Sequence, residues 1–176
     1  VKSWISASFP DVAGGANEEM RSNLQKMFDK YIGPTIFWLR KNCKFVIPIS
    51  YFSLVESLCK GLYPMLFGNV SNIEYWFIFT LVWAIGGVLT EKDGIDYRKE
   101  FSNWWKSEWK SSVKFPSKGT VFDYFVESNS EGALGLEEWT KNIQTTEFEF
   151  GMQMGSLTIQ TKETVASSEF IRAFLK

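Results

Sequence analysis

The longest apolar run of the chain is Ile73–Leu89, in which Glu74 is the only charged residue. Large apolar side chains follow one another without a polar face, so a helix here has to be covered on every side. Its uncharged part, Tyr75–Leu89, has 15 residues and reaches roughly 22 Å, less than the roughly 30 Å hydrocarbon core of a bilayer. We therefore predict a buried helix at the centre of a helical domain, with a membrane span as the alternative.

Amphipathic helical patterns precede this central segment. Asn17 is a suitable N-cap for a first long helix, and Pro34 predicts a kink or a restart within it. Ser50 or Ser53 can cap the next helix. Glu56 follows Ser53 by three residues, which favours a capping box at Ser53.

Turn and cap residues mark the connections around the central segment. Pro48 predicts an extended connector over Phe45–Ile49. Asp93-Gly94 predicts a turn, and Asp96 opens another amphipathic helix. We expect this helix to pack on the central one through the aromatic residues of one side: Tyr97, Phe101, Trp104, Trp105 and Trp109.

The pattern changes after Phe115–Gly119, which breaks the helical periodicity. Thr120–Val126 has the composition of a strand, and Glu127–Leu136 is polar and contains glycine, which favours a loop. Thr161 or Thr164 can cap a last amphipathic helix. Three more short strands are predicted between the loop and that helix: Trp139–Ile143, Glu147–Phe150 and Ser156–Gln160.

The first sixteen residues predict an irregular lead-in, because Pro10 and two glycines interrupt any periodicity. Trp4 and Ile5 in this segment could anchor it to something outside the chain. The chain does not begin with methionine and its last residues fall within a predicted helix, so we expect a piece of a longer protein.

Composition narrows the possible functions. Apolar residues make up 45% of the 176 residues, with 16 Phe and 8 Trp, which is enough for a sizeable core. Histidine is absent, and this excludes histidine-based acid–base chemistry and Ser–His or Cys–His nucleophile pairs. Cys43 and Cys59 lie in apolar helical contexts, where we expect buried, reduced thiols.

The net charge of −1 gives no overall positive field to attract nucleic acid. Charge is nevertheless uneven along the chain. Arg98–Lys118 holds six basic residues against two acidic ones, and Val121–Glu163 holds eight acidic residues against two basic ones. Two solvated faces explain this split, and surfaces complementary to neighbouring modules are the alternative.

No stretch carries a recognisable nucleotide-binding motif. A phosphate-loop motif is absent. The most similar stretch, Pro116–Thr120, lacks the first glycine of the motif and does not have a lysine followed directly by a serine or threonine. Gly86-Gly87 lacks the preceding strand and the spacing of a dinucleotide site. We therefore predict no catalytic residue, and the sequence leaves any cofactor-binding residue unknown.

Metal and nucleic-acid sites are not indicated either. Asp93, Gly94 and Asp96 lack the ligand spacing and the closing glutamate of a calcium loop. The tryptophans of Trp104–Lys110 are expected to pack on one helix face rather than to stack on bases. We expect solvated side chains at four carboxylates that could form pairs: Glu137, Glu138, Glu147 and Glu149.

Several stretches resemble the dynein heavy chain family. Residues 28–49, FDKYIGPTIFWLRKNCKFVIPI, are similar to a helix of the family and its Lys-hydrophobic-Ile/Val-Pro-Ile connector, and LVESLCKGL at 54–62 is similar to the helix that follows. VWAIGG at 82–87 resembles the family's Val/Ile-Trp-Ala-Phe-Gly-Gly helix, and residues 96–126 are the most specific piece. The sequence of these stretches is more similar to axonemal than to cytoplasmic heavy chains. Gln160–Arg172 departs from the family, which has a more apolar strand and an Arg-Val-Arg-like run there.

The resemblance implies the helical small subdomain, or lid, of the second AAA+ module, followed by the start of the third. It implies an α+β, mainly α fold with a lead-in over 1–16, a helical lid bundle over 17–112 and a β-rich segment with a terminal helix over 113–176. A phosphate loop would then lie beyond Lys176. Such a fragment would not be an enzyme, whereas its parent would be an ATP-hydrolysing microtubule motor.

The resemblance also implies partners and a location. The fragment would couple the nucleotide state of adjacent AAA+ modules of the same heavy chain, which would bind ATP and Mg. Dynein light and intermediate chains and microtubules would be partners of the parent, in the cytoskeleton and most specifically in the ciliary axoneme. Neither nucleic acid nor a membrane is an expected partner. The alternative is an independent protein-docking helical domain that uses Trp4, Trp104 or Trp139 as an anchor.

Overall fold

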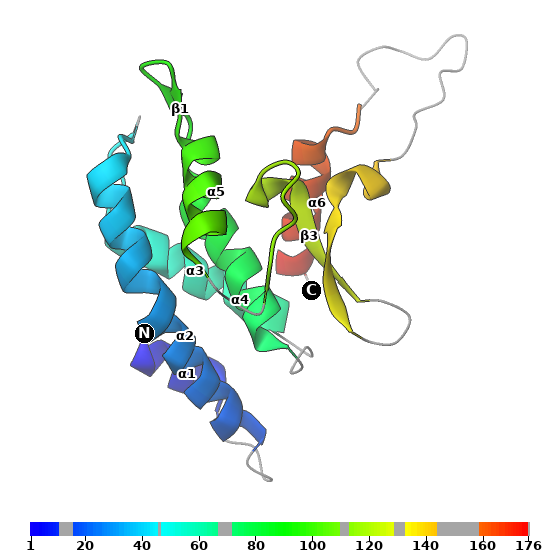
Figure 1. Ribbon diagram of the computed structural model, residues 1–176. Helices are drawn as coiled ribbons and strands as arrows, with labels where there is room; N and C mark the ends of the chain where they lie inside the picture. The colour runs from blue at the N-terminus through cyan, green and yellow to red at the C-terminus, as the bar shows by residue number, and fades with distance from the viewer. Residues whose placement is uncertain are drawn as a thin grey trace.

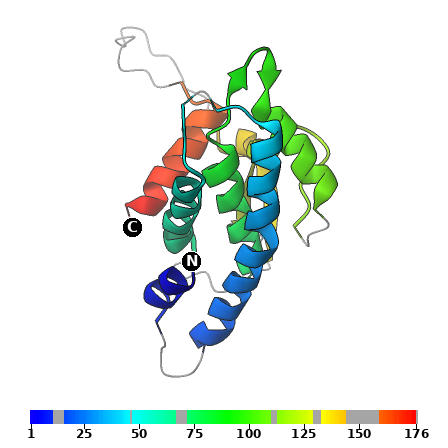
Figure 2. The same ribbon diagram turned by 90° about the vertical axis from the view of Figure 1, so that its left-hand side faces the viewer.

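The computed structural model describes residues 1–10, 16–45, 47–66, 72–109, 113–128, 133–143 and 159–175. Five helices form a bundle, and a two-stranded sheet with a last helix packs on one side of it (Figure 1; Figure 2). This arrangement confirms the predicted α+β, mainly α fold. The bundle comprises α1 (Lys2–Ser8), α2 (Ala16–Asn42), α3 (Tyr51–Leu66), α4 (Ile73–Leu81) with the π-helical turn η1 (Val82–Gly86), and α5 (Tyr97–Glu108). The C-terminal segment comprises the 3-10 turn η2 (Val121–Asp123), β3 (Tyr124–Ser128), β4 (Leu134–Glu138), the 3-10 turn η3 (Trp139–Asn142) and α6 (Lys162–Phe174).

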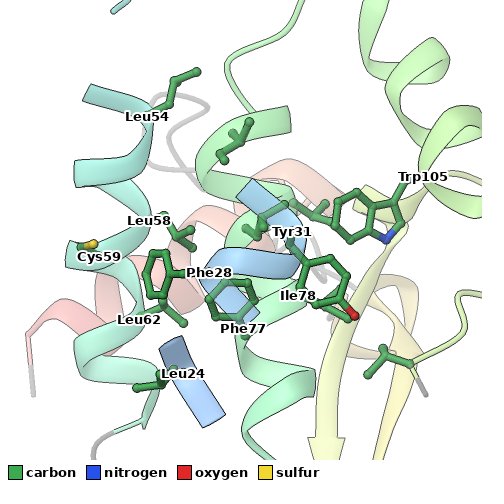
Figure 3. Close-up of a cluster of buried hydrophobic side chains, with 14 of the residues drawn as sticks. Leu24, Phe28, Tyr31, Leu54, Leu58, Cys59, Leu62, Phe77, Ile78 and Trp105 are labelled. Carbon is green, nitrogen blue, oxygen red and sulfur yellow. The ribbon is translucent and has the colours of Figure 1, made fainter. Parts of the chain in front are cut away.

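The predicted central helix is α4 with η1, and it lies in the interior. Phe77, Ile78, Leu81 and Ile85 are fully buried. Helices α2 and α3 and strand β3 all contact α4, which confirms the prediction of a buried central helix, although Tyr75 and Trp76 in its first turn are only half-buried. No helix within the described ranges is long and apolar enough to cross a membrane. Figure 3 shows Phe77 and Ile78 among side chains from α2, α3 and α5: Leu24, Phe28, Tyr31, Leu58, Leu62 and Trp105.

Helix α2 continues through Pro34, so of the two predicted alternatives, a kink or a restart, the restart is wrong. A proline inside a helix removes one backbone hydrogen bond and costs about 3 kcal/mol. Tyr31 and Leu39, on either side of Pro34, are fully buried in the same core. The Thr35 hydroxyl also donates to the Tyr31 carbonyl at 2.7 Å. Tertiary packing therefore holds both halves of α2 in one helix despite the local penalty.

The predicted irregular lead-in is wrong for Lys2–Ser8, which form α1. Ile5 and Phe9 are buried in the main core. The Trp4 ring makes edge contacts with Phe9 and Phe28, at centroid distances of 5.9 and 6.2 Å. This segment is therefore anchored to α2 of the same chain, and packing rather than local periodicity makes it helical.

The cap of α3 differs from the favoured prediction. The helix begins at Tyr51, and the Ser53 backbone N–H donates to Ser50 Oγ at 3.0 Å. Ser50 is therefore the cap, and the Ser53–Glu56 box is wrong. Glu56 instead forms an ion pair with Lys60 one turn later, at 2.7 Å.

The predicted turn at Asp93-Gly94 is the tip of a β-hairpin. Strand β1 (Glu91–Lys92) pairs antiparallel with β2 (Ile95–Asp96). Both turn residues have positive φ, 56° and 76°, as a two-residue hairpin turn requires. Asp96 then caps α5 as predicted, because its carboxylate accepts from the Lys99 backbone N–H at 3.1 Å.

Helix α5 has the predicted aromatic side, with Tyr97, Phe101 and Trp105 buried. Trp105 stacks on Tyr31 of α2 at 5.9 Å between ring centroids. The expected contact with the central segment occurs at its C-terminal end, where Phe101 lies against Gly86. The two cysteines of the bundle are unpaired; Cys59 is buried and Cys43 is half-buried.

The strand-rich segment is less regular than predicted. Thr120–Val126 divides between η2 and β3. The predicted loop Glu127–Leu136 contains the end of β3 and the beginning of β4, and these strands pair antiparallel with Tyr124 opposite Glu138. Trp139–Ile143 was predicted as a strand, but the structure has the turn η3 there. The cause is Trp139, which is buried against the bundle and ends the strand pairing.

The remaining predictions for the C-terminal segment have mixed outcomes. Residues 147–150 and 156–158 lie outside the described residues, and Ile159 and Gln160 are not in a strand. Thr161 caps α6, because its hydroxyl accepts from the Thr164 backbone N–H at 3.3 Å. The amphipathic face of α6 is only partly covered, since Val165 is buried and Phe174 is 56% exposed.

A test of the packing around η1 is the substitution Gly86→Ala. An added Cβ would lie 2.7 Å from Phe101 Cε1 and 2.9 Å from Phe122 Cζ, so both rings would have to move. Overpacking of this kind costs about 1–3 kcal/mol, and we expect a loss of that size in the free energy of unfolding measured with urea. Gly135→Ala is the matched control, because nothing lies within 4 Å of the added atom. Equal effects of the two substitutions would contradict the packing described here.

Candidate functional site

The residues considered as binding sites from the sequence have structural roles. Pro116–Thr120 lead into the short 3-10 turn η2 and then strand β3, and not into an α-helix as a phosphate loop does. Asp93 and Gly94 form the hairpin tip, and Asp96 is a helix cap. Trp104 stacks on Trp38 with ring centroids 4.8 Å apart. No group of three potential metal-ligating side chains occurs among the described residues.

Glu137 and Glu138, the two of the four candidate carboxylates that the structure describes, each bind a lysine. Glu137 forms an ion pair with Lys141, and Glu138 forms one with Lys118 at 3.0 Å. The hydrogen bond and charge of Lys118 hold the pKa of Glu138 below its ordinary value. Glu147 and Glu149 lie outside the described residues.

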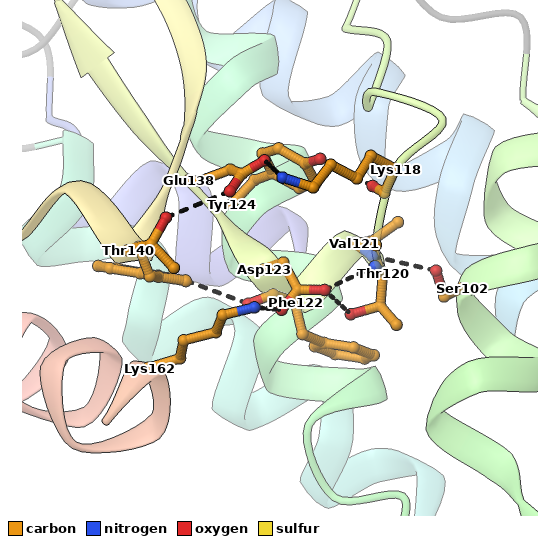
Figure 4. A network of polar contacts seen from close by, with 12 residues as sticks. Ser102, Lys118, Thr120, Val121, Phe122, Asp123, Tyr124, Glu138, Thr140 and Lys162 are labelled. Carbon is orange, nitrogen blue, oxygen red and sulfur yellow. Dashed lines mark hydrogen bonds and ion pairs between the residues drawn. The ribbon is translucent and has the colours of Figure 1, made fainter. Parts of the chain in front are cut away.

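The most developed polar arrangement lies where the bundle meets the C-terminal segment (Figure 4). One buried hydrogen bond crosses this junction, and a second fixes the turn η2 within the C-terminal segment. The Val121 backbone N–H donates to Ser102 Oγ of α5 at 3.0 Å, and the Trp139 indole N–H donates to the Phe122 carbonyl at 3.1 Å. The turn η2 is therefore fixed to the bundle on one side and to η3 on the other.

Asp123 holds the turn η2 and connects it to α6. Its carboxylate accepts from the Thr120 backbone N–H at 2.7 Å and from the Thr120 hydroxyl at 3.0 Å. The Lys162 ammonium lies 2.8 Å from its other oxygen. Partial burial would raise the pKa of Asp123, but the hydrogen bonds from Lys162 and Thr120 together outweigh burial, so the pKa lies below its ordinary value.

Two lysines fasten the segment that leads into η2. The Lys106 ammonium on α5 donates to the Gly119 carbonyl at 2.8 Å, and partial burial lowers its pKa. Lys118 reaches across to Glu138 of β4, while the Tyr124 hydroxyl donates to the Lys118 carbonyl at 2.7 Å. These contacts tie α5, η2, β3 and β4 to one another.

Aromatic rings fill the space beneath this polar layer. Phe79 of α4 stacks on Phe170 of α6 with centroids 5.3 Å apart. Trp83 of η1 packs edge-on against Phe122 at 5.7 Å, and the Arg98 guanidinium lies 4.4 Å from the Phe122 ring centre. The central helix thus contributes directly to the interior of the C-terminal segment.

These contacts connect the bundle physically to the C-terminal segment. Few of the residues that form them could be identified from the sequence. Ser102 and Lys162 carry no motif that distinguishes them from other polar residues. Thr120 and Asp123 have the Ser/Thr-x-x-Asp/Glu spacing of a cap, and this signal could have been recognised. Trp139 was recognised only as a possible anchor for an external partner, whereas it is buried within the chain.

The buried bond across the junction is tested by Ser102→Ala. This substitution leaves the buried Val121 N–H without its acceptor, which costs about 1–3 kcal/mol. We expect a decrease of that size in the free energy of unfolding and faster hydrogen exchange at Val121. The control is Ser107→Ala on the exposed side of the same helix, and a similar loss there would contradict a specific role for Ser102.

The pH dependence of stability tests the Asp123 contacts. Because the pKa of Asp123 is lowered in the folded state, its contribution is fully present above the unfolded value near 3.8 and is lost as the pH falls through the folded value. We expect Asp123→Asn to be less stable than the unmodified chain at pH 6 and the difference to shrink only as the pH falls below about 3.8. Urea unfolding from pH 6 to pH 2.5 measures this, and a difference independent of pH would contradict it.

Comparison with known proteins gives the family of the chain. The family model of the dynein heavy chain AAA lid domain matches residues 24–141, about two thirds of the chain. The chain is 34% identical over 164 residues to dynein axonemal heavy chain 9 of Homo sapiens, a match that covers 88% of the chain and 4% of the relative. It is 34% identical over 155 residues to the dynein alpha chain of the flagellar outer arm of Chlamydomonas reinhardtii, covering 84% and 3%. It is 36% identical over 151 residues to the ciliary dynein beta chain of Heliocidaris crassispina, covering 82% and 3%.

The chain therefore spans only 3–4% of the length of these relatives. The matched residues include the whole of α3, α4, η1 and α5, and they extend through the junction to η3. This extent agrees with the predicted resemblance. The protein belongs to the dynein heavy chain AAA lid domain family.

Proposed function

We propose that this chain is the lid region between the second and third AAA+ modules of a dynein heavy chain, and that it transmits nucleotide-dependent movements from one module to the next. In this proposal residues 17–112 form the lid and residues 113–176 begin the following module, after the lead-in at 1–16. A lid that moves as a rigid body can transmit a change at one site to a neighbour without binding both ligands itself.

The observation that carries the proposal is the shared interior of the bundle and the C-terminal segment. Phe79 and Trp83 of the central segment pack against Phe170 and Phe122 beyond the bundle. The buried Ser102–Val121 hydrogen bond closes the same junction from α5. Close-packed interiors deform little, so a displacement of the lid would carry the C-terminal segment with it.

The chemical steps would take place elsewhere in the heavy chain. The sequence has no phosphate-loop motif, and we propose that this segment is not catalytic and that ATP and Mg are bound by the parent motor. Its direct partners would be the neighbouring AAA+ modules. Microtubules and the dynein light and intermediate chains would act through the parent, and the axonemal, flagellar and ciliary names of the relatives support a place in the axoneme.

An independent docking domain is less well supported, because its proposed anchors are used within the chain. Trp139 is buried and stacks on Phe125 at 4.8 Å. Trp104 stacks on Trp38, and Trp4 packs against Phe9 and Phe28. None of the three therefore projects as a single unpartnered tryptophan.

The proposal is tested in a complete dynein heavy chain that contains this segment. Ser102→Ala combined with Lys162→Ala removes the buried bond and the Asp123 ion pair from the junction. Changes at positions between coupled sites typically alter coupling by 0.5–2 kcal/mol, so we expect microtubule stimulation of ATP turnover to fall by about two- to thirtyfold. Basal turnover should persist, because no phosphate-loop residue is changed.

Ser107→Ala on the same helix is the control and should leave the stimulation unchanged. Hydrogen exchange at the Val121 amide reports whether the double variant has loosened the junction. Full microtubule stimulation with a loosened junction would contradict the proposed coupling role.

A further inference from the structure

A groove of about 690 Å³ lies between the C-terminal end of α2 and the outer side of α5. The two helices run side by side there, next to the β1–β2 hairpin (Figure 1). Trp38 and Trp104 line the groove and stack with an interplanar angle of 17°. Both rings are half-buried, so the pair presents an indole surface to solvent. The other lining residues are Asn42, Ile95, Tyr97, Glu100, Asn103 and Ser107.

Glu100 is the one charged side chain that lines this groove in the described part of the chain. Glu100 is exposed, and within the described ranges it has no cationic partner. Glu100 also affects a neighbouring thiol. Burial, and to a smaller extent the Glu100 carboxylate, raise the pKa of Cys43 to about 11. The groove also lies at the C-terminal end of α2, which is the negative end of the helix dipole. Arg40 and Lys41 are in that last turn, but neither lines the groove.

The polar side chains of the groove include acceptors for a ligand that donates hydrogen bonds. The Asn42 amide N–H already donates to the Trp38 carbonyl at 2.9 Å, which leaves its Oδ1 as an acceptor. The Asn103 amide is exposed on α5, three residues after Glu100. The Glu100 carboxylate and these amide oxygens are therefore acceptors that line the same groove as the indole rings.

We propose that this groove binds the guanidinium group of an arginine presented by a partner polypeptide. A guanidinium is planar and carries five N–H donors without an acceptor, so it can stack on an indole and bind a carboxylate with its edge. Tryptophan is the aromatic side chain that attracts cations most strongly. A lysine ammonium would fit less well, because it is a strongly hydrated point charge that cannot stack.

The proposal is independent of the coupling role. The groove residues belong to the side of α5 that carries Glu100, Asn103 and Trp104, whereas Ser102 and Lys106 face the junction. A substitution that abolishes one function would therefore leave the residues of the other function unchanged.

The test is an NMR titration of the 176-residue chain with acetyl-Gly-Arg-Gly-amide, followed at the indole N–H signals of Trp38 and Trp104. We expect saturable shifts of these two signals. The same peptide with citrulline in place of arginine has the same shape without the charge and should bind much more weakly. Because an exposed ion pair contributes up to about 1 kcal/mol, Glu100→Gln should weaken arginine binding by about two- to fivefold.

Glu108→Gln is the matched control, because Glu108 is exposed on the same helix but does not line the groove. It should bind the arginine peptide like the unmodified chain. Absence of saturable shifts, equal binding of the citrulline peptide, or unchanged binding by Glu100→Gln would each overturn the proposal.

Discussion

The fold depends on enclosing one helix that has no polar side. α4 and η1 place large apolar side chains in every direction, so each direction requires a neighbour. Helices α2 and α3 and strand β3 cover α4, and Phe101 of α5 covers the end of η1. Fully burying one such side chain contributes about 1.5–3 kcal/mol, and several of them are involved. The surrounding elements are therefore held in place chiefly by what they cover.

The same requirement explains why the C-terminal segment packs so closely on the bundle. The side of the central segment that carries Phe79 and Trp83 would be exposed without α6 and η2. Once these aromatic contacts exclude water, the nearby polar groups need partners within the chain. Ser102 accepts from the Val121 N–H, and Lys162 pairs with Asp123. Within the described part of the chain, the Trp83 indole N–H is buried without a hydrogen-bond partner. Hydrophobic enclosure therefore outweighs an unmet polar group at this junction.

The sequence predicted the features that depend on local pattern. The central helix, the Asp93-Gly94 turn and the Asp96 and Thr161 caps each have a short-range signal, and the structure contains all of them. Features that depend on distant contacts were missed or wrong. Helix α1 forms because Ile5 and Phe9 reach the core, and η3 replaces a strand because Trp139 does. The junction could not be predicted, since Ser102 and Val121 meet only after folding.

The π-helical turn at Val82–Gly86 limits the ways in which the central segment can move. Ile85 belongs to the interior of the bundle, whereas Trp83, two residues earlier, also packs on rings of the C-terminal segment. A twist of the segment about its own axis would pull both side chains out of their surroundings at once. Rocking together with its neighbours disturbs neither. An external force would therefore meet resistance to rotation of this segment about its own axis. It would meet less resistance to tilting of the segment together with its neighbours.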